Sequence, residues 1–127
     1  MALIPDLIWI SPHPGPGPGT VVVTHLHLRR LRDVPAFFRT SVAVYRQAVG
    51  SPGARSVRMR AQPLARRFTT VSWWDDDAAV QAYAVAEPHR SAMRSWRDRM
   101  AAAEIVRRPG EEGTVPAVEL LASAASS

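Results

Sequence analysis

Two consecutive stretches of alternating side chains constrain the fold of this chain most. ARSVRMRAQ at 54–62 sets Val57, Met59 and Ala61 opposite its polar residues, and RFTTVSWW at 67–74 alternates again. Because successive side chains of a strand point to opposite faces, each stretch predicts a strand. The break between them is short and contains a proline, so the two strands are predicted to form an antiparallel hairpin.

The segment before the hairpin predicts a strand followed by a helix. TVVVTHLHL at 20–28 is rich in β-branched residues and reads as a strand. Asp33 and Pro35 are typical of a helix start, and SPG at 51–53 ends the helix. Its apolar positions at helical spacing are Phe38, Val42, Tyr45 and Val49.

The segment after the hairpin predicts two helices and a last strand. Asp75, Asp76 and Asp77 are placed to cap a helix over 78–86, and a second helix is predicted from Pro88 to about Ala103. EIVRR at 104–108 is a short fourth strand. The order β-α-β-β-α-β predicts an α+β fold of the ferredoxin-like, split βαβ type with an antiparallel four-stranded sheet.

The domain is predicted to occupy residues 20–127, with a short C-terminal extension in which VPAVELLASA forms a helical turn or two. Residues 1–19 form an apolar N-terminal arm, MALIPDLIWI, and a Pro/Gly-rich linker, SPHPGPGPG, which has no means of packing a core. The arm can pair with a neighbouring sheet edge, cover the mouth of a pocket, or remain a mobile tail.

Composition excludes several kinds of chemistry. The chain of 127 residues has no cysteine, and all 16 of its positive residues are arginine, so thiolate and lysine Schiff-base catalysis are excluded. The arginines behind the net charge of +5 are scattered, so we expect no nucleic-acid partner. No run approaches the roughly 20 apolar residues of a membrane span and the opening residues lack a signal-peptide pattern, so we expect a cytoplasmic protein.

His89 is the first candidate for chemistry. On the helix that begins at Pro88, one face carries His89, Met93, Trp96 and Met100, so the imidazole is predicted to point into the domain near a helix N-terminus. The helix dipole disfavours a charged imidazole there. A neutral, inward histidine can be a general base, a proton shuttle or a haem ligand, or a buried side chain bonded to the backbone.

Aromatic residues form the second candidate set. Trp73, Trp74, Tyr83 and Trp96 can line a flat apolar pocket or simply fill the core. Trp73 and Trp74 must face opposite sides of their strand, so only one of them can line a given cavity. The pattern does not decide which one, although Trp74 shares its face with Ser72.

The remaining polar clusters carry weaker predictions. His25 and His27 form an HxH pair that could share a metal, but no third ligand accompanies them, so no metal site is predicted. A polar or intersubunit sheet face explains the pair equally. Arg58 and Arg60 lie opposite the apolar face of their strand, where they can bind an anionic oxygen or remain exposed.

RFTTVSWWDDDAAVQAYAVAEPHRSAMRSW resembles the signature of antibiotic-biosynthesis-monooxygenase-like proteins. In that family a strand ending in Ser-x-Trp leads through acidic residues into a helix and then to a Pro-His-Arg-like junction. VVVTHLHLRRLRDVPAFFRTSVAVYRQAVGSPGA also fits the family's order, so the resemblance covers about residues 20–108. It is nearest to the branch of spheroidene-monooxygenase-like proteins.

The resemblance implies a homodimer that pairs sheet to sheet as a dimeric α+β barrel. Family members include cofactor-independent quinone-forming monooxygenases, haem-using proteins and polyketide cyclases. The positions that match are Trp74 or Trp73 at the strand end, Tyr83 on the helix, and His89 at the junction. Haem-degrading members often use an asparagine, which this chain lacks, whereas a haem held by His89 stays open.

Together these observations predict a monooxygenase of aromatic or polyketide metabolism that acts on a phenolic or polycyclic substrate without a cofactor. His89 is the predicted general base, with Tyr83 and Arg58 as further catalytic residues. Two alternatives use the same residues: a polyketide cyclase or isomerase, and a non-catalytic binding or regulatory dimer. The predicted substrate-binding residues are Trp74, Trp96, Met93, Ser72 and Phe38.

Overall fold

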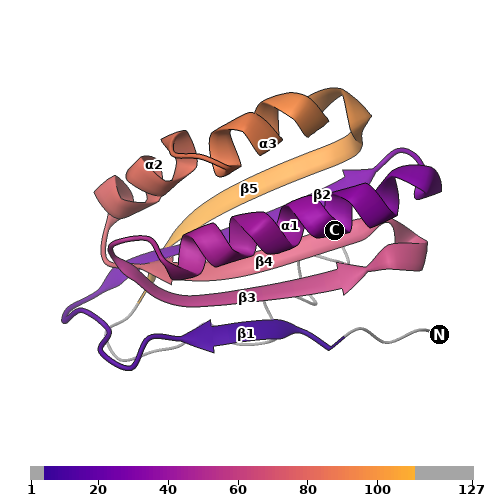
Figure 1. The fold of residues 1–127 in the computed structure, drawn as a ribbon. Helices are drawn as coiled ribbons and strands as arrows, with labels where there is room; N and C mark the ends of the chain where they lie inside the picture. Colours follow the sequence, from indigo (N-terminus) through magenta and orange to yellow (C-terminus); the bar gives the residue numbers. More distant parts are fainter. Residues whose placement is uncertain (1–4, 111–127) are drawn as a thin grey trace.

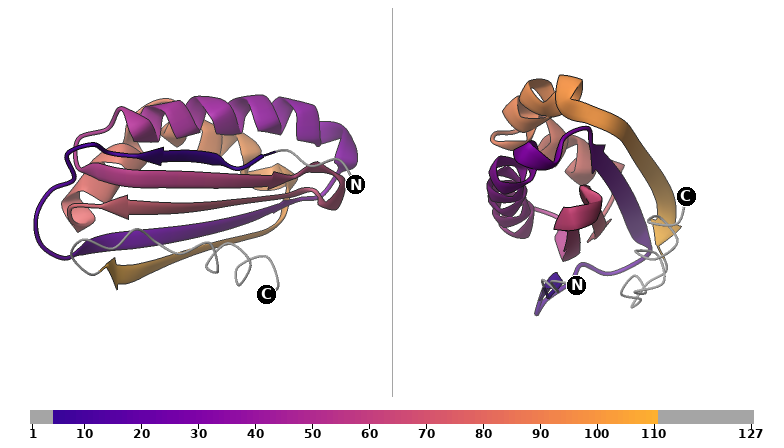
Figure 2. Two further views of the ribbon diagram at one scale, coloured as in Figure 1. Left: turned by 90° about the horizontal axis from the view of Figure 1, so that it is seen from below. Right: turned by 90° about the vertical axis from the view of Figure 1, so that its right-hand side faces the viewer.

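A curved antiparallel sheet carries the three α-helices on one of its faces (Figures 1 and 2). The computed structural model describes residues 5–110. The strands lie in the order β1-β3-β4-β2-β5. Their bounds are β1 Leu7–Ile10, β2 Gly19–Leu28, β3 Ala54–Gln62, β4 Arg67–Trp74 and β5 Met100–Gly110, and those of the helices are α1 Val34–Val49, α2 Asp77–Val85 and α3 His89–Trp96.

The predicted fold class is confirmed, because strands β2 to β5 and the helices follow the ferredoxin-like order. The predicted hairpin is formed by β3 and β4, in which Met59 pairs with Thr70. β2 lies between β4 and β5, and its Val23 pairs with Val71 on one side and Val106 on the other. The helix-facing sides of these strands form the floor on which the helices pack.

The sheet has five strands rather than the four that were predicted, because the N-terminal arm adds β1 to the edge of β3. Leu7 pairs with Met59 and Ile10 with Ser56. The carboxylate of Asp6 accepts two hydrogen bonds of 3.0 Å from Arg60, which anchor the residue just before β1. Of the three states predicted for the arm, residues 7–10 therefore adopt the one that pairs with a sheet edge.

The last predicted helix is too long. It was predicted to reach about Ala103, but α3 ends at Trp96, a 3₁₀ turn covers Arg97–Arg99, and β5 begins at Met100. The physical reason is pairing with β2, which holds Ala102 opposite His27 and Ala103 opposite Leu26. Cross-strand hydrogen bonding here overrides the helical preference of the alanines.

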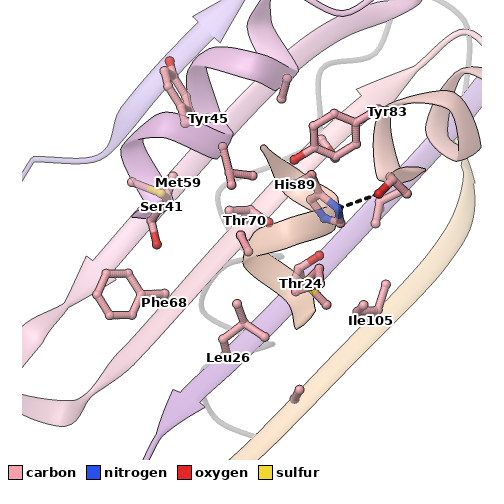
Figure 3. A pocket seen from close by; sticks show the side chains of 18 of the residues that line it. Thr24, Leu26, Ser41, Tyr45, Met59, Phe68, Thr70, Tyr83, His89 and Ile105 are labelled. Atoms are coloured by element: carbon pink, nitrogen blue, oxygen red, sulfur yellow. Dashed lines mark hydrogen bonds between the residues drawn. The ribbon is translucent and has the colours of Figure 1, made fainter. Parts of the chain in front are cut away.

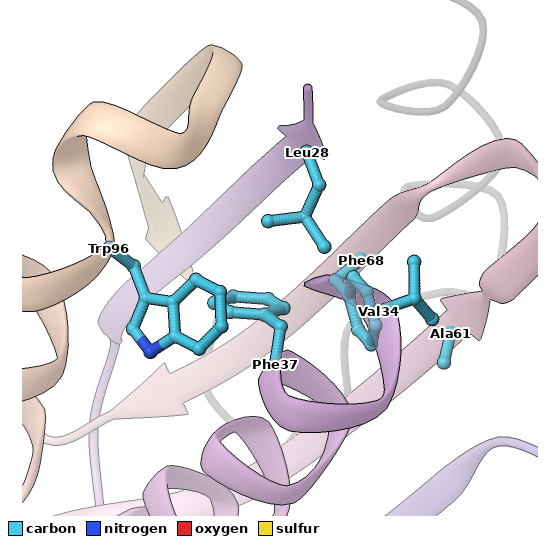
Figure 4. Packing of buried hydrophobic residues seen from close by; sticks show 6 residues of the cluster. All are labelled: Leu28, Val34, Phe37, Ala61, Phe68 and Trp96. Carbon is cyan, nitrogen blue, oxygen red and sulfur yellow. The ribbon is translucent and has the colours of Figure 1, made fainter. Parts of the chain in front are cut away.

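A cluster of large apolar side chains joins one end of α1 to α3 and the sheet (Figure 4). The ring of Phe37 packs edge-on against the rings of Phe68 and Trp96, with distances between ring centroids of 4.8 Å and 5.0 Å. Such aromatic pairs stabilise a core beyond the area they bury. A second cluster lies toward α2 and contains Val22, Ala48, Val57, Trp74 and Val80.

The helical turn predicted within VPAVELLASA lies outside the described residues. Within residues 5–110 no helix has the length and apolar character required to cross a membrane.

Candidate active site

A cavity of about 340 Å³ lies between the sheet and the helices (Figure 3). Its volume falls at the small end of the range of about 300–1,000 Å³ that is typical of ligand sites. The walls are mainly apolar, with hydroxyl groups from the floor strands, α1 and α2. The side chains that contribute those hydroxyls are Thr24, Thr40, Ser41, Tyr45, Thr70, Ser72 and Tyr83.

His89 lines this cavity at the first residue of α3. Its backbone N–H donates to Gln47 Oε1 at 2.7 Å, and its ring Nδ1 lies 3.0 Å from the carbonyl oxygen of Ala84. A carbonyl only accepts hydrogen bonds, so Nδ1 must carry the proton. In the neutral ring Nε2 then keeps the lone pair, and it can accept a proton from a ligand.

Burial favours that neutral state. Loss of solvent lowers the pKa of His89 below its usual value of 6.5, and the hydrogen bond to Ala84 opposes this shift only in part. At neutral pH the imidazole is therefore unprotonated and available as a base.

Two aromatic rings continue the wall beside His89. The Tyr83 ring lies 4.8 Å from the His89 ring and 4.9 Å from the Trp74 ring, measured between centroids. Burial raises the pKa of Tyr83 well above its usual value of 10.0, so its hydroxyl stays protonated and can donate a hydrogen bond. The wall thus offers flat apolar surfaces, one neutral phenol and one base.

Gln47 is a positioning residue that the sequence did not reveal. From α1 it accepts the His89 N–H through Oε1 and donates Nε2 to the carbonyl of Tyr83 at 3.0 Å. One side chain thus ties both α2 and α3 to α1 and holds the junction that carries the base. A single glutamine within an amphipathic helix gives no pattern from which this role could be predicted.

The structure brings most of the predicted site residues together. The cavity is lined by His89, Tyr83, Trp74, Ser72, Met93 and Trp96. Of the two adjacent tryptophans Trp74 faces the cavity, whereas Trp73 packs with Val21, Val23 and Val71 on the other face of the sheet. Their roles in chemistry stay predictions, but their placement as one group is a structural finding.

Two predicted residues lie elsewhere. Arg58 pairs in register with Ile8 on the sheet face away from the helices, because residues at odd and even positions of β3 face opposite sides. Phe38 packs at the margin of the Figure 4 cluster, and Phe37 lines the cavity in its place. A shift of one residue on a helix turns a side chain by about 100°, which explains the exchange.

The cations that do line the cavity are Arg97 and Arg107, neither of which was predicted for the site. Arg97 follows α3 directly, in the segment that was predicted to remain helical, and Arg107 lies on the extended β5. The error in the end of α3 concealed Arg97, whereas Arg107 lay in the strand predicted at 104–108, whose cavity-facing side was not predicted.

The other polar clusters have structural roles. Asp76 caps α2 as predicted, since its Oδ1 accepts the Ala79 N–H at 2.8 Å. His25 lies on the face away from the helices, with Nδ1 3.1 Å from Thr69 Oγ1. In the described part of the chain no three histidine or acidic residues gather in a way that could hold a metal ion.

Solved structures share this fold at low sequence identity. A Listeria monocytogenes ferredoxin-fold protein described as related to antibiotic biosynthesis monooxygenases is 16% identical, with a TM-score of 0.63 over 84% of this chain and 62% of its own. A Nitrosomonas europaea protein provisionally named an antibiotic biosynthesis monooxygenase is 14% identical, with a TM-score of 0.67 over 81% of this chain and 99% of its own.

A Fusobacterium nucleatum protein provisionally named a monooxygenase is 9% identical, with a TM-score of 0.66 over 84% of this chain. The match spans 50% of that protein, so this chain covers half its length. No protein-family model and no curated protein sequence matches the chain. At these identities the comparisons establish the ferredoxin-like fold alone.

Proposed function

We propose that this protein is a small-molecule enzyme, a cofactor-independent monooxygenase that acts on a phenolic or polycyclic aromatic substrate. The observation that carries the proposal is the bonding of His89, whose Nδ1–H donates to Ala84 and leaves Nε2 as a base on an aromatic-walled cavity. The names of the structural neighbours point to the same class of reaction. The narrower placement among spheroidene-monooxygenase-like proteins is part of the proposal, although none of the three structures carries that name.

In the proposed mechanism the substrate packs beside Tyr83, whose ring rests on the buried Trp74, and transfers its phenolic proton to Nε2 of His89. The resulting phenolate is electron-rich at its ring carbons and reduces dioxygen itself. One oxygen atom becomes a new quinone carbonyl, and the other leaves as water with the phenolic proton and the hydrogen of the attacked carbon. The substrate supplies all four electrons, so this reaction requires no redox cofactor.

The protein contributes orientation and a largely dry environment to this reaction. The Tyr83 hydroxyl, neutral because burial raises its pKa, is a hydrogen-bond donor for a developing oxyanion. Trp96 and Met93 come from α3 and close the cavity beside His89. Arg58 takes no part in this mechanism, because it lies on the opposite face of the sheet.

The experiment that tests this function measures oxygen consumption and product together. We expect the purified protein, colourless above 350 nm, to convert a hydroxynaphthalene or an anthrone to the quinone with one dioxygen consumed per product. Labelled dioxygen should leave one labelled atom in the quinone. Conversion of the substrate to a redox-neutral product without oxygen uptake would favour the cyclase or isomerase, and a haem absorption band in active protein would contradict the cofactor-independent mechanism.

We also propose that the protein is a homodimer joined through the sheet face opposite the helices. Ile8 and Ile10 are each 51% exposed on that face, beside the cluster of Val21, Val23, Val71 and Trp73, which is itself buried within the chain. Exposed apolar side chains that extend an apolar sheet face are typical of an interface.

Light scattering during gel filtration is expected to give twice the chain mass of 13.9 kDa. The Ile10→Glu variant should shift the protein toward the monomer, because it places a charge in the interface. Leu64→Glu is the matched control, since Leu64 is 73% exposed but lies in the connection between β3 and β4. A dimer that survives Ile10→Glu unchanged would refute this interface.

A further inference from the structure

The charged side chains that line the cavity are all positive. Its lining residues include two arginines, Arg97 and Arg107, but no aspartate or glutamate. With His89 neutral, the formal charge of the lining is positive. Because the remaining walls are mainly apolar, an anionic ligand is favoured over a neutral or cationic one of the same shape.

The two arginines stand at different ends of the cavity. Arg107 pairs in register with Val22, whereas Arg97 precedes Met100, which pairs with Leu28. Val22 and Leu28 are six residues apart along β2, which corresponds to about 20 Å in an extended strand. A single acidic group can therefore contact only one of the two.

Arg107 belongs to the end that carries the aromatic wall. Its register partner Val22 also pairs with Ser72 and packs in the cluster of Trp74 and Val80, against which Tyr83 lies. A ring packed beside Tyr83 would thus extend toward Arg107 rather than toward Arg97.

The guanidinium of Arg107 is available to a ligand. Within residues 5–110 its ion-pair partner is Asp77, with Nη1 to Oδ1 at 4.0 Å, and the two side chains are 44% and 73% exposed. Ion pairs of this length and exposure contribute little, so a ligand carboxylate can replace the pair at small cost. A planar guanidinium also matches a carboxylate with two parallel hydrogen bonds.

We propose that the substrate is an aromatic acid, and that Arg107 selects it by binding a carboxylate away from the ring on which His89 acts. Arg107 enters the cavity from β5 and His89 from the start of α3, so the two groups reach a ligand from different elements. The inference rests on the proposed function for the identity of the site. It adds the charge of the substrate and the residue, Arg107, that recognises this charge.

The test compares 2-naphthoate with 2-naphthamide, which share a ring system and differ in charge. By titration calorimetry the wild-type protein is expected to bind the carboxylate about tenfold more tightly at low salt, as one charge-assisted contact predicts. Added sodium chloride should weaken the preference. Arg107→Gln should reduce the preference to about onefold by weakening naphthoate binding.

Arg108→Gln is the matched control, because it removes the same charge from the adjacent residue of β5, which faces the other side of the sheet. It should keep the tenfold preference. Equal binding of the two probes, failure of both to bind, equal losses in the two variants, or loss through Arg97→Gln instead would each overturn the assignment. Because binding is measured without turnover, a carboxylate preference in a protein that consumes no oxygen would refute the proposed reaction alone.

Discussion

Replacing His89 with glutamine is expected to lower the turnover number for a phenolic substrate by about 10²–10⁴-fold, the range typical of a lost general base. Glutamine keeps a polar side chain of similar reach that can still bond to the Ala84 carbonyl, but it cannot take up a proton at neutral pH. The measurement is steady-state oxygen uptake, with the circular dichroism spectrum as evidence that the variant is folded.

His13→Gln is the matched control for this substitution. His13 is exposed in the segment before β2 and does not line the cavity, so its replacement should leave turnover unchanged. A His89→Gln protein that retained the wild-type rate would exclude His89 as the base and would favour a binding or regulatory role for the fold.

The pH dependence of kcat/KM provides a second test of His89 as the base. The base is active when His89 is unprotonated, so kcat/KM should be low in acid, rise with pH and reach a plateau. Because burial lowers the pKa of His89 below 6.5, the inflection should lie below that value. An inflection above pH 7 would require another group to be the base.

The strands of the site could be predicted because the side chains of a strand alternate strictly between its two faces. β3 and β4 have the predicted bounds, and Ser72 and Trp74 share the cavity face because alternate residues of a strand must. The histidine was also placed correctly on its helix, since Met93 and Trp96 follow it at helical spacing. In these segments one local pattern determines which way each side chain points.

The features of the site that were not predicted depend on contacts between segments distant in the sequence. In the apolar set chosen for α1, Tyr45 and Val49 pack against the core as predicted, but Phe38 was selected where Phe37 lines the cavity. A helix with apolar residues over a wide arc does not specify its inward face to one residue. Arg97 was missed because β2 pairing, not local preference, decides where β5 begins, and Arg107 because the pairing with β2 decides which face of β5 lines the cavity. Gln47 acts through partners 36 and 42 residues away.

The role of Arg55 could not be predicted either, because it depends on contacts with the Pro/Gly-rich linker. Its side chain is 2% exposed and donates to Asp75 Oδ1 at 2.7 Å, to the Gly17 carbonyl at 2.8 Å and to the Pro16 carbonyl at 2.9 Å. The guanidinium also lies over the Trp73 ring at 4.8 Å from its centroid. One buried cation thus fastens the segment between β1 and β2 to the ends of β3 and β4.

Replacing Arg55 with alanine is therefore expected to lower the free energy of unfolding by about 3 kcal/mol, since removal of one partner leaves buried groups without their hydrogen bonds. This lies at the lower end for buried pairs because the Asp75 side chain is 42% exposed. For a domain of this size the melting temperature should fall by roughly 10–20 °C.

Chemical denaturation followed by tryptophan fluorescence measures this loss. Arg55→Lys should fall between the wild type and Arg55→Ala, because an ammonium keeps the charge but cannot reproduce the planar fork that reaches three acceptors. Arg108→Ala, on the exposed edge strand, should change the free energy of unfolding by no more than about 0.5 kcal/mol. If Arg55→Ala matched Arg108→Ala, the linker would be held by β1 pairing alone and the arginine would contribute nothing.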